Sequence, residues 1–245
     1  MKTTERHKLK ENEFARTVGR ARHAVETRSR DIVKVLLGIV LLLAIAGAYM
    51  WWRGSQESRG NELLASALAA YEMPVVPPQP PAPGSPPPLP QPGTYQSEQE
   101  RLDASLPLFL EAADARPGSR AAITARYHAA GILAATGRHA EAEEHYRQVV
   151  DRAGDSIYGR TGRLGLAETQ VAQGKFDSAI DIYTELSRDT GSPLPLDSVL
   201  IHMGRAYARA GRADEATRTF NRIVDEFPQS PYAADARREL AEIKS

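Results

Sequence analysis

Residues 204–228 read GRAYARAGRADEATRTFNRIVDEFP, and this stretch decides the fold. Gly211 separates two runs whose apolar residues recur at helical spacing, and glycine readily takes the left-handed conformation that ends a helix. Ala216 follows Gly211 by five positions and Phe220 follows it by nine. The stretch therefore predicts two helices joined by a short turn, with a small and an aromatic residue on the second helix.

The same spacing recurs along the chain at an interval of 37 residues, as Gly137, Ala142 and Tyr146, as Gly174, Ala179 and Tyr183, and as Gly211, Ala216 and Phe220. Periods of about 20 to 50 residues indicate stacked repeats, in which each helix pair buries its apolar face against its neighbours. The sequence therefore predicts an all-α solenoid over residues 94–245, a surface for binding.

About three full repeats are expected. Their helices are predicted at 120–136 and 139–151, at 159–173 and 176–188, and at 196–210 and 213–226. Continuing the period backwards identifies 99–115 as the second helix of a degenerate leading repeat, whose first helix the prolines before it displace. Residues 230–244 are expected to form a terminal capping helix with a polar outer side.

The third unit resembles the tetratricopeptide repeat, through Gly204, Tyr207, Gly211, Ala216, Phe220 and Pro228. The three units depart from that pattern at the consensus tryptophan, which is replaced by Arg126, Arg163 and Leu200 in turn. The resemblance implies that the first helices line a concave groove for extended peptide segments. In that groove Tyr127, Leu164 and Ile201 would offer apolar contacts, and Glu168 and Arg205 would orient a peptide. Packing between helices is the alternative role for these residues.

An apolar segment precedes the repeats. Residues 32–52 read IVKVLLGIVLLLAIAGAYMWW, in which Lys34 is the single charge. As a helix the segment would be about 31 Å long, which matches a hydrocarbon core of about 30 Å. We expect it to contact the lipid bilayer as a transmembrane signal anchor.

Basic residues set the expected topology. Residues 1–53 hold 11 Lys and Arg against 5 Asp and Glu, whereas the remainder holds 20 against 26. The positive-inside rule then makes 1–31 a cytoplasmic arm and places the repeats across the membrane. A signal peptide cleaved after Ala48 is the alternative.

Two segments connect the apolar stretch to the repeats. Residues 53–73 include an amphipathic run that predicts a short helix, either packed on the repeats or paired with a partner. Residues 74–93 hold 11 prolines, which exclude regular helix and favour an extended linker. Such a linker could act as a spacer.

The whole arrangement resembles the YfgM family of bacterial inner-membrane proteins, through its basic amino terminus, single span ending in Trp51-Trp52-Arg53, adjacent Ala/Leu-rich helix and carboxy-terminal repeats. That resemblance implies a single-pass inner-membrane protein with a periplasmic domain, an ancillary subunit of the Sec translocon that works with a membrane-bound periplasmic chaperone on exported proteins. The alternative is a cell-envelope coordinator whose linker reaches peptidoglycan or outer-membrane machinery.

The sequence argues against enzymatic, metal-binding and nucleic-acid-binding functions. The chain has no cysteine, so thiolate catalysis and Cys-ligated zinc are excluded. The acidic repeats disfavour nucleic acid as a partner. His139 and Glu143 share a helix face but have no further ligand at metal-binding spacing. With no catalytic constellation in the sequence, we expect no enzyme activity, no cofactor and no metal.

Overall fold

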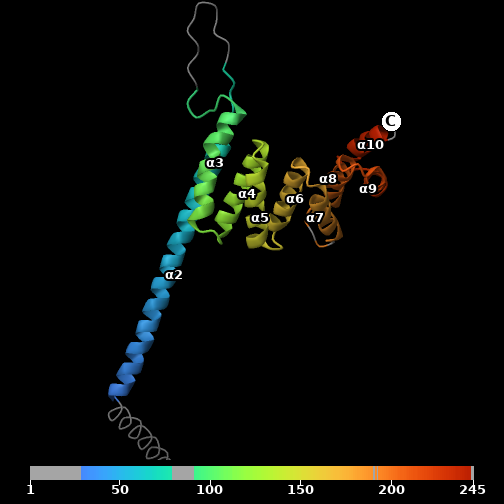
Figure 1. Ribbon diagram of the computed structural model, residues 1–245. Helices are drawn as coiled ribbons and strands as arrows, with labels where there is room; N and C mark the ends of the chain where they lie inside the picture. Colours follow the sequence, from blue (N-terminus) through green and yellow to red (C-terminus); the bar gives the residue numbers. More distant parts are fainter. Residues whose placement is uncertain (1–28, 79–90, 190, 192, 244–245) are drawn as a thin grey trace, which may run out of the picture. The chain divides into compact units, whose positions relative to one another are not determined.

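The computed structural model describes residues 29 to 78, 91 to 189, 191 and 193 to 243 (Figure 1). In these ranges the chain is all-α, as predicted, with a long apolar helix followed by stacked helix pairs. It divides after Ser55 into two compact units, which we describe separately. Most of the predicted cytoplasmic arm, residues 1 to 28, lies outside the described residues.

The amino-terminal unit contains the first part of helix α2 (Ser29–Tyr71). Its large apolar side chains are exposed, from 48% at Ile39 to 77% at Trp51. By length and composition this helix could cross a membrane. Residues 32–52 and most of 53–73 lie in this one helix, so the predicted separate short helix is not a separate element.

The second unit begins at Gln56 and holds the end of α2 and the repeats. Its further helices are α3 (Glu98–Ala115), α4 (Arg120–Ala135), α5 (His139–Ala153), α6 (Ile157–Ala172), α7 (Phe176–Arg188), α8 (Leu196–Arg209), α9 (Ala213–Glu226) and α10 (Ala233–Ile243). Serine hydroxyls accept from backbone amides at the starts of α3, α4 and α6, which explains why these helices begin there. The predicted helix pairs are confirmed, with small differences at their ends.

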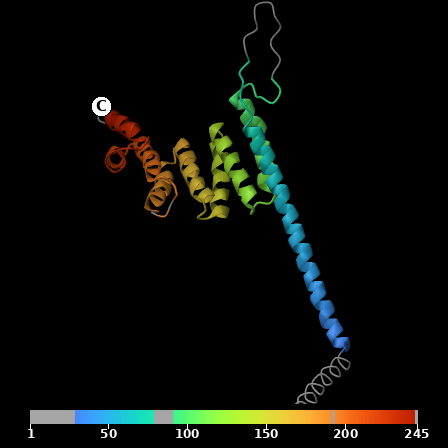
Figure 2. The same cartoon turned by 180° about the vertical axis from the view of Figure 1, so that it is seen from behind.

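The leading repeat is complete, which corrects the prediction that its first helix is displaced. The end of α2 takes that place: Ala67 is fully buried in a core cluster with Leu102 and Phe109 of α3. The ring of Tyr71 lies 5.9 Å from that of Phe109, and Gly60 approaches Ala121 at the start of α4. Figures 1 and 2 show α3 alongside this part of α2 from both sides.

The proline-rich segment is therefore inserted between the two helices of the leading repeat. Its ends are tied together, because the Val76 amide donates to the Tyr95 carbonyl at 2.8 Å and the Tyr95 amide donates to the Pro74 carbonyl at 3.0 Å. A segment whose ends meet does not separate the parts that precede and follow it. The prediction that 74–93 is a spacer is not supported by this connection. Residues 79 to 90 lie outside the described residues.

The turns within the repeats follow one pattern. Gly137, Gly174 and Gly211 have φ angles of 77°, 75° and 74°, the left-handed conformation that the sequence predicts. The residue after each glycine donates its amide to a carbonyl five positions earlier, at 2.8 to 2.9 Å. These bonds use carbonyls that the helix ends would otherwise leave unpaired.

A buried arginine occupies the position of the consensus tryptophan in the first full repeat. Arg126 is 5% exposed and donates to the Ala113 carbonyl at 3.1 Å and to the Asp114 carboxylate at 2.6 Å. Its other terminal nitrogen lies 3.3 Å from Nδ1 of His145. These polar contacts join the leading repeat to the next one, where a tryptophan would have joined them by apolar packing.

The core consists of two apolar clusters, one centred on the leading and first full repeats and one on the remaining repeats and α10. In the second cluster Ala236 of α10 is fully buried, and Tyr232 and Leu240 pack against the cluster. Arg237 and Arg238 are exposed. The terminal helix thus caps the stack with a polar outer side, as predicted.

Candidate functional site

The first helices of the three full repeats form a continuous surface, since α4 contacts α6 and α6 contacts α8. We call the surface of α4, α6 and α8 the inner surface. Sequence reasoning places five candidate binding residues on it, and the structure gives them different surroundings.

Tyr127 is half-buried on α4, near the middle of a group of aromatic rings. Its ring centroid lies 6.0 Å from that of Tyr146 and 5.9 Å from that of Tyr158, both in edge-to-face orientation. Burial raises the pKa of the Tyr127 phenol, while a hydrogen bond with the Thr161 hydroxyl opposes the shift. The phenol is therefore neutral near pH 7 and offers both an apolar ring and a polar tip.

The row of rings continues toward the leading repeat. His128 stacks on Phe109 with centroids 5.1 Å apart, and its ring lies 6.1 Å from that of Tyr71. Burial lowers the pKa of His128, so the imidazole is neutral near pH 7. Arg101 lies over the Tyr71 ring at 5.0 Å. The candidate surface thus has an aromatic side that includes the end of α2.

Glu168 provides the negative charge of the inner surface. Its side chain is 46% exposed, and one carboxylate oxygen lies 3.2 Å from Nδ1 of His202 on α8. Burial among its neighbours raises the pKa of the Glu168 carboxyl. Burial, and then the Arg205 guanidinium, lower the pKa of His202. Both shifts favour the uncharged forms of the two side chains, so the contact does not act as a strong ion pair.

Leu164 is half-buried and packs against the second core cluster. Part of its side chain remains open to solvent beside Glu168 on the same helix. Leu164 can therefore offer the apolar contact that the sequence predicts for it.

Ile201 does not lie on the accessible surface, which corrects its prediction as a groove contact. Its side chain is 0% exposed, within the cluster that contains Tyr183 of α7 and Phe220 of α9. Val199, Leu200 and Ile201 are all buried at the start of α8, so the helix is covered on more than one side. Packing between helices, the alternative role, is the one that Ile201 has.

Arg205 forms ion pairs with the terminal helix α10. Its guanidinium donates to Glu239 at 2.8 Å and to Asp235 at 3.0 Å, both on α10. These two carboxylates hold the pKa of Arg205 above its ordinary value, although burial opposes the shift. Arg205 therefore positions α10 against α8, and its charge is already balanced within the protein.

Sequence reasoning did not identify the contribution of Tyr158 to this surface, whereas His202, like His128, is expected on a first helix in a packing or groove-lining role. Tyr158 is half-buried in the first turn of α6 beside Tyr127, and the ring of His202 stacks on that of Tyr183 at 6.4 Å. A signal for Tyr158 was present, because Tyr158, Thr161 and Leu164 follow one another at intervals of three residues and so lie along one side of the helix.

The described residues contain no group of three or more potential metal ligands. Glu143, considered above beside His139, is buried at 3% exposure and accepts from Lys175 at 2.7 Å and from Gln173 at 2.8 Å. Those bonds lower the pKa of the Glu143 carboxyl, although burial opposes them. The carboxylate joins two repeats.

A stack of helix pairs with an aromatic inner surface and one exposed carboxylate defines an α-solenoid scaffold. Family models described as tetratricopeptide repeat match residues 120–188, 164–231 and 201–243. These matches together span half of the chain, which therefore belongs to the tetratricopeptide-repeat family. Members of this class mediate protein–protein interactions and are typically non-catalytic.

Two crystal structures of nearly identical TPR-like repeats resemble the chain. Both are of a Podosopora anserina protein described as a kinesin light chain, one in a point-variant form. Each aligns with a TM-score of 0.52 over 58% of this chain and 77% of the other, at 18% and 17% identity. At such identity the likeness concerns the fold alone. No curated protein matches the chain significantly.

Proposed function

We propose that the chain is a membrane-anchored periplasmic scaffold whose inner surface binds extended segments of other proteins. The observation that carries this proposal is the group formed by half-buried Tyr127, Tyr158 and Leu164 beside the exposed Glu168 carboxylate. Aromatic and aliphatic side chains hold apolar residues of a bound segment, and a carboxylate fixes its register through a donor.

The charge of this group suggests the kind of segment bound. Glu168 is the exposed acid at the centre, while the nearby Arg205 charge is balanced by Asp235 and Glu239. A segment with an apolar side chain and a lysine or arginine a few residues away would complement both features. Exported precursors, which are extended while they cross a membrane, present such segments.

The setting of the proposal comes from the amino-terminal part of the chain. Residues 32–52 would anchor the protein in the bacterial inner membrane, and only three residues separate them from Gln56, where the folded unit begins. Together with the YfgM resemblance, this favours an accessory of the Sec translocon that works beside a membrane-bound chaperone. The envelope-coordinator alternative relies on a long spacer, and the joined ends of the proline-rich segment disfavour it.

Site-specific photocrosslinking in cells tests the proposal. A benzoylphenylalanine at Tyr158 would report contacts of the inner surface, and one at Asp181, an exposed position on a second helix, is the matched control. We expect adducts with translocating precursors and translocon subunits at position 158 and not at position 181. Equal adduct patterns at the two positions, or none at 158, would contradict the proposal.

Charge reversal provides a second readout. Glu168→Lys should reduce the yield of precursor adducts at position 158 by about tenfold, because a charge complementary to the bound segment is replaced by a repelling one. Asp181→Lys makes the same change on a second helix and should leave the yield unchanged. Circular dichroism of both variants establishes that the repeats remain folded.

A further inference from the structure

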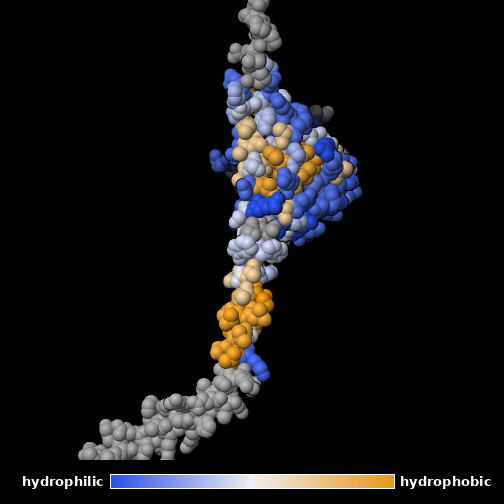
Figure 3. All heavy atoms as spheres, turned by 90° about the vertical axis from the view of Figure 1, so that its left-hand side faces the viewer, coloured by the Kyte–Doolittle hydropathy of each residue, from blue (hydrophilic) through white to orange (hydrophobic). Residues whose placement is uncertain are grey.

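The two ends of the repeat stack differ in polarity. At the carboxy-terminal end α10 exposes Arg237, Arg238 and Glu242. At the other end, the face of α3 and of residues 56–71 of α2 carries a hydrophobic patch (Figure 3). Terminal repeats of soluble solenoids need a polar outer side, so this patch indicates a partner.

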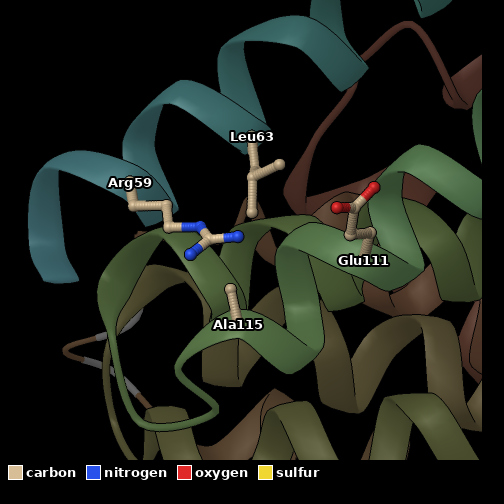
Figure 4. Close-up of a pocket in the computed structure, with 4 residues that line it drawn as sticks. All are labelled: Arg59, Leu63, Glu111 and Ala115. Carbon is tan, nitrogen blue, oxygen red and sulfur yellow. The ribbon is translucent and has the colours of Figure 1, made fainter.

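The groove between the two helices at this end has a defined chemistry (Figure 4). A cavity of about 190 Å³ is lined by Leu63 and Ala115, with Arg59 from α2 and Glu111 from α3 on either side. Arg59 and Glu111 form no ion pair with each other or with any residue in the described ranges. The groove thus presents an apolar floor between one positive and one negative group.

A groove with a positive group on one side of an apolar floor and a negative group on the other is complementary to a second copy of itself rotated by half a turn. The rotation brings the positive side of one copy against the negative side of the other, and every contact occurs twice. We propose that this end of the stack is a dimer interface between two copies of the chain, in which Arg59 of each copy pairs with Glu111 of the second copy.

The direction of the helices agrees with such a pairing. Because α3 lies alongside the end of α2, a two-fold axis parallel to the helices places α2 of one copy against α3 of the other. The Leu63 and Leu108 side chains, half-buried in one copy, then gain apolar contacts. The inner surface takes no part, so the proposal does not depend on the function proposed for that surface.

Charge reversal tests the interface on the full chain in lipid nanodiscs, with mass measured across a range of protein concentrations. Wild type is expected to be a dimer. Arg59→Glu and Glu111→Arg each place like charges together twice, and we expect each to weaken dimerisation at least about tenfold. The double variant Arg59→Glu/Glu111→Arg should restore it. Arg237→Glu, at the other end of the stack, should leave the dimer unchanged.

Cysteine crosslinking in native membranes gives an independent measurement, because the natural chain has no cysteine. Leu63→Cys should give a crosslinked dimer with a short bifunctional reagent, whereas Ala234→Cys on α10 should not. A monomeric wild type would overturn the proposal. A dimer that survives both single charge reversals would also overturn it, because association would then be assigned to the apolar segment. Crosslinks from position 63 to another protein alone would overturn it as well.

Discussion

Single residues determine how closely the helices of this stack approach. A Cβ atom on Gly165 would lie 2.5 Å from the ring of Tyr146, which packs across the boundary between two repeats. On the preceding first helix, a Cβ on Gly131 would lie 3.7 Å from the hydroxyl of the same tyrosine. The first distance is too short for any side chain and the second is an ordinary contact, so of these two glycines Gly165 is the one that packing requires.

Alanine substitution of these two glycines should therefore have opposite effects. Gly165→Ala forces the Tyr146 ring to move and should lower the free energy of unfolding by about 1 to 3 kcal/mol. Gly131→Ala should raise it by up to about 1 kcal/mol, because alanine favours the helix. Urea unfolding followed by circular dichroism measures both. Equal stability of the two variants would contradict the close approach at Gly165.

At the scale of the helices, what the sequence predicts depends on whether the repeat period is kept. The turns at Gly137, Gly174 and Gly211 keep the 37-residue interval, and their helices were predicted to within a few residues. The amphipathic run within 53–73 was expected to pack on the repeats or to pair with a partner, but it was not assigned as the first helix of the leading repeat, because the proline-rich insertion moves it out of the period. Its packing on α3, with Ala67 and Tyr71 beside Phe109, identifies it.

The candidate site was predictable to a smaller extent. The period assigns Leu164 and Ile201 equivalent positions, yet Leu164 is half-buried and Ile201 is fully buried. The pattern locates a residue on a helix, but the neighbouring helices determine its exposure. For Arg205 the partners are Asp235 and Glu239, which lie on a helix outside the period.

The buried carboxylate of Glu143 joins adjacent helix pairs. Glu143→Ala leaves the Lys175 ammonium and the Gln173 amide without their acceptor, and should lower the free energy of unfolding by about 2 to 4 kcal/mol. Glu144→Ala, the exposed neighbour, should change it by less than about 0.5 kcal/mol. If Glu143→Ala unfolds with the same urea midpoint as Glu144→Ala, the carboxylate does not hold the repeats together.

For the molecule as a whole, the completed leading repeat moves the start of the scaffold to the end of α2. The folded unit begins at Gln56 and includes the end of α2, so the proline-rich segment is an insertion within the scaffold. The scaffold therefore begins within a few residues of the apolar segment 32–52, and the proline-rich segment does not separate the two.

Protonation of three histidines should couple the stability of the whole stack to pH. Burial lowers the pKa values of His128, His145 and His202, and nearby arginines lower the latter two further. The unfolded chain, with histidine pKa values of about 6.5, binds protons before the folded chain does. The free energy of unfolding should therefore fall as the pH is lowered from about 7.5 to about 5.5.

Glu168 has the opposite effect on the free energy of unfolding. Its pKa is raised in the folded state, so the folded chain binds a proton at this carboxyl at a higher pH than the unfolded chain does. One acid opposes three histidines, so we expect the net slope to keep the histidine sign above about pH 5.5. Urea unfolding of the full chain at several pH values measures the slope. Replacing all three histidines by glutamine should flatten it, and stability that is constant or rises on acidification of the wild type would contradict the assignment.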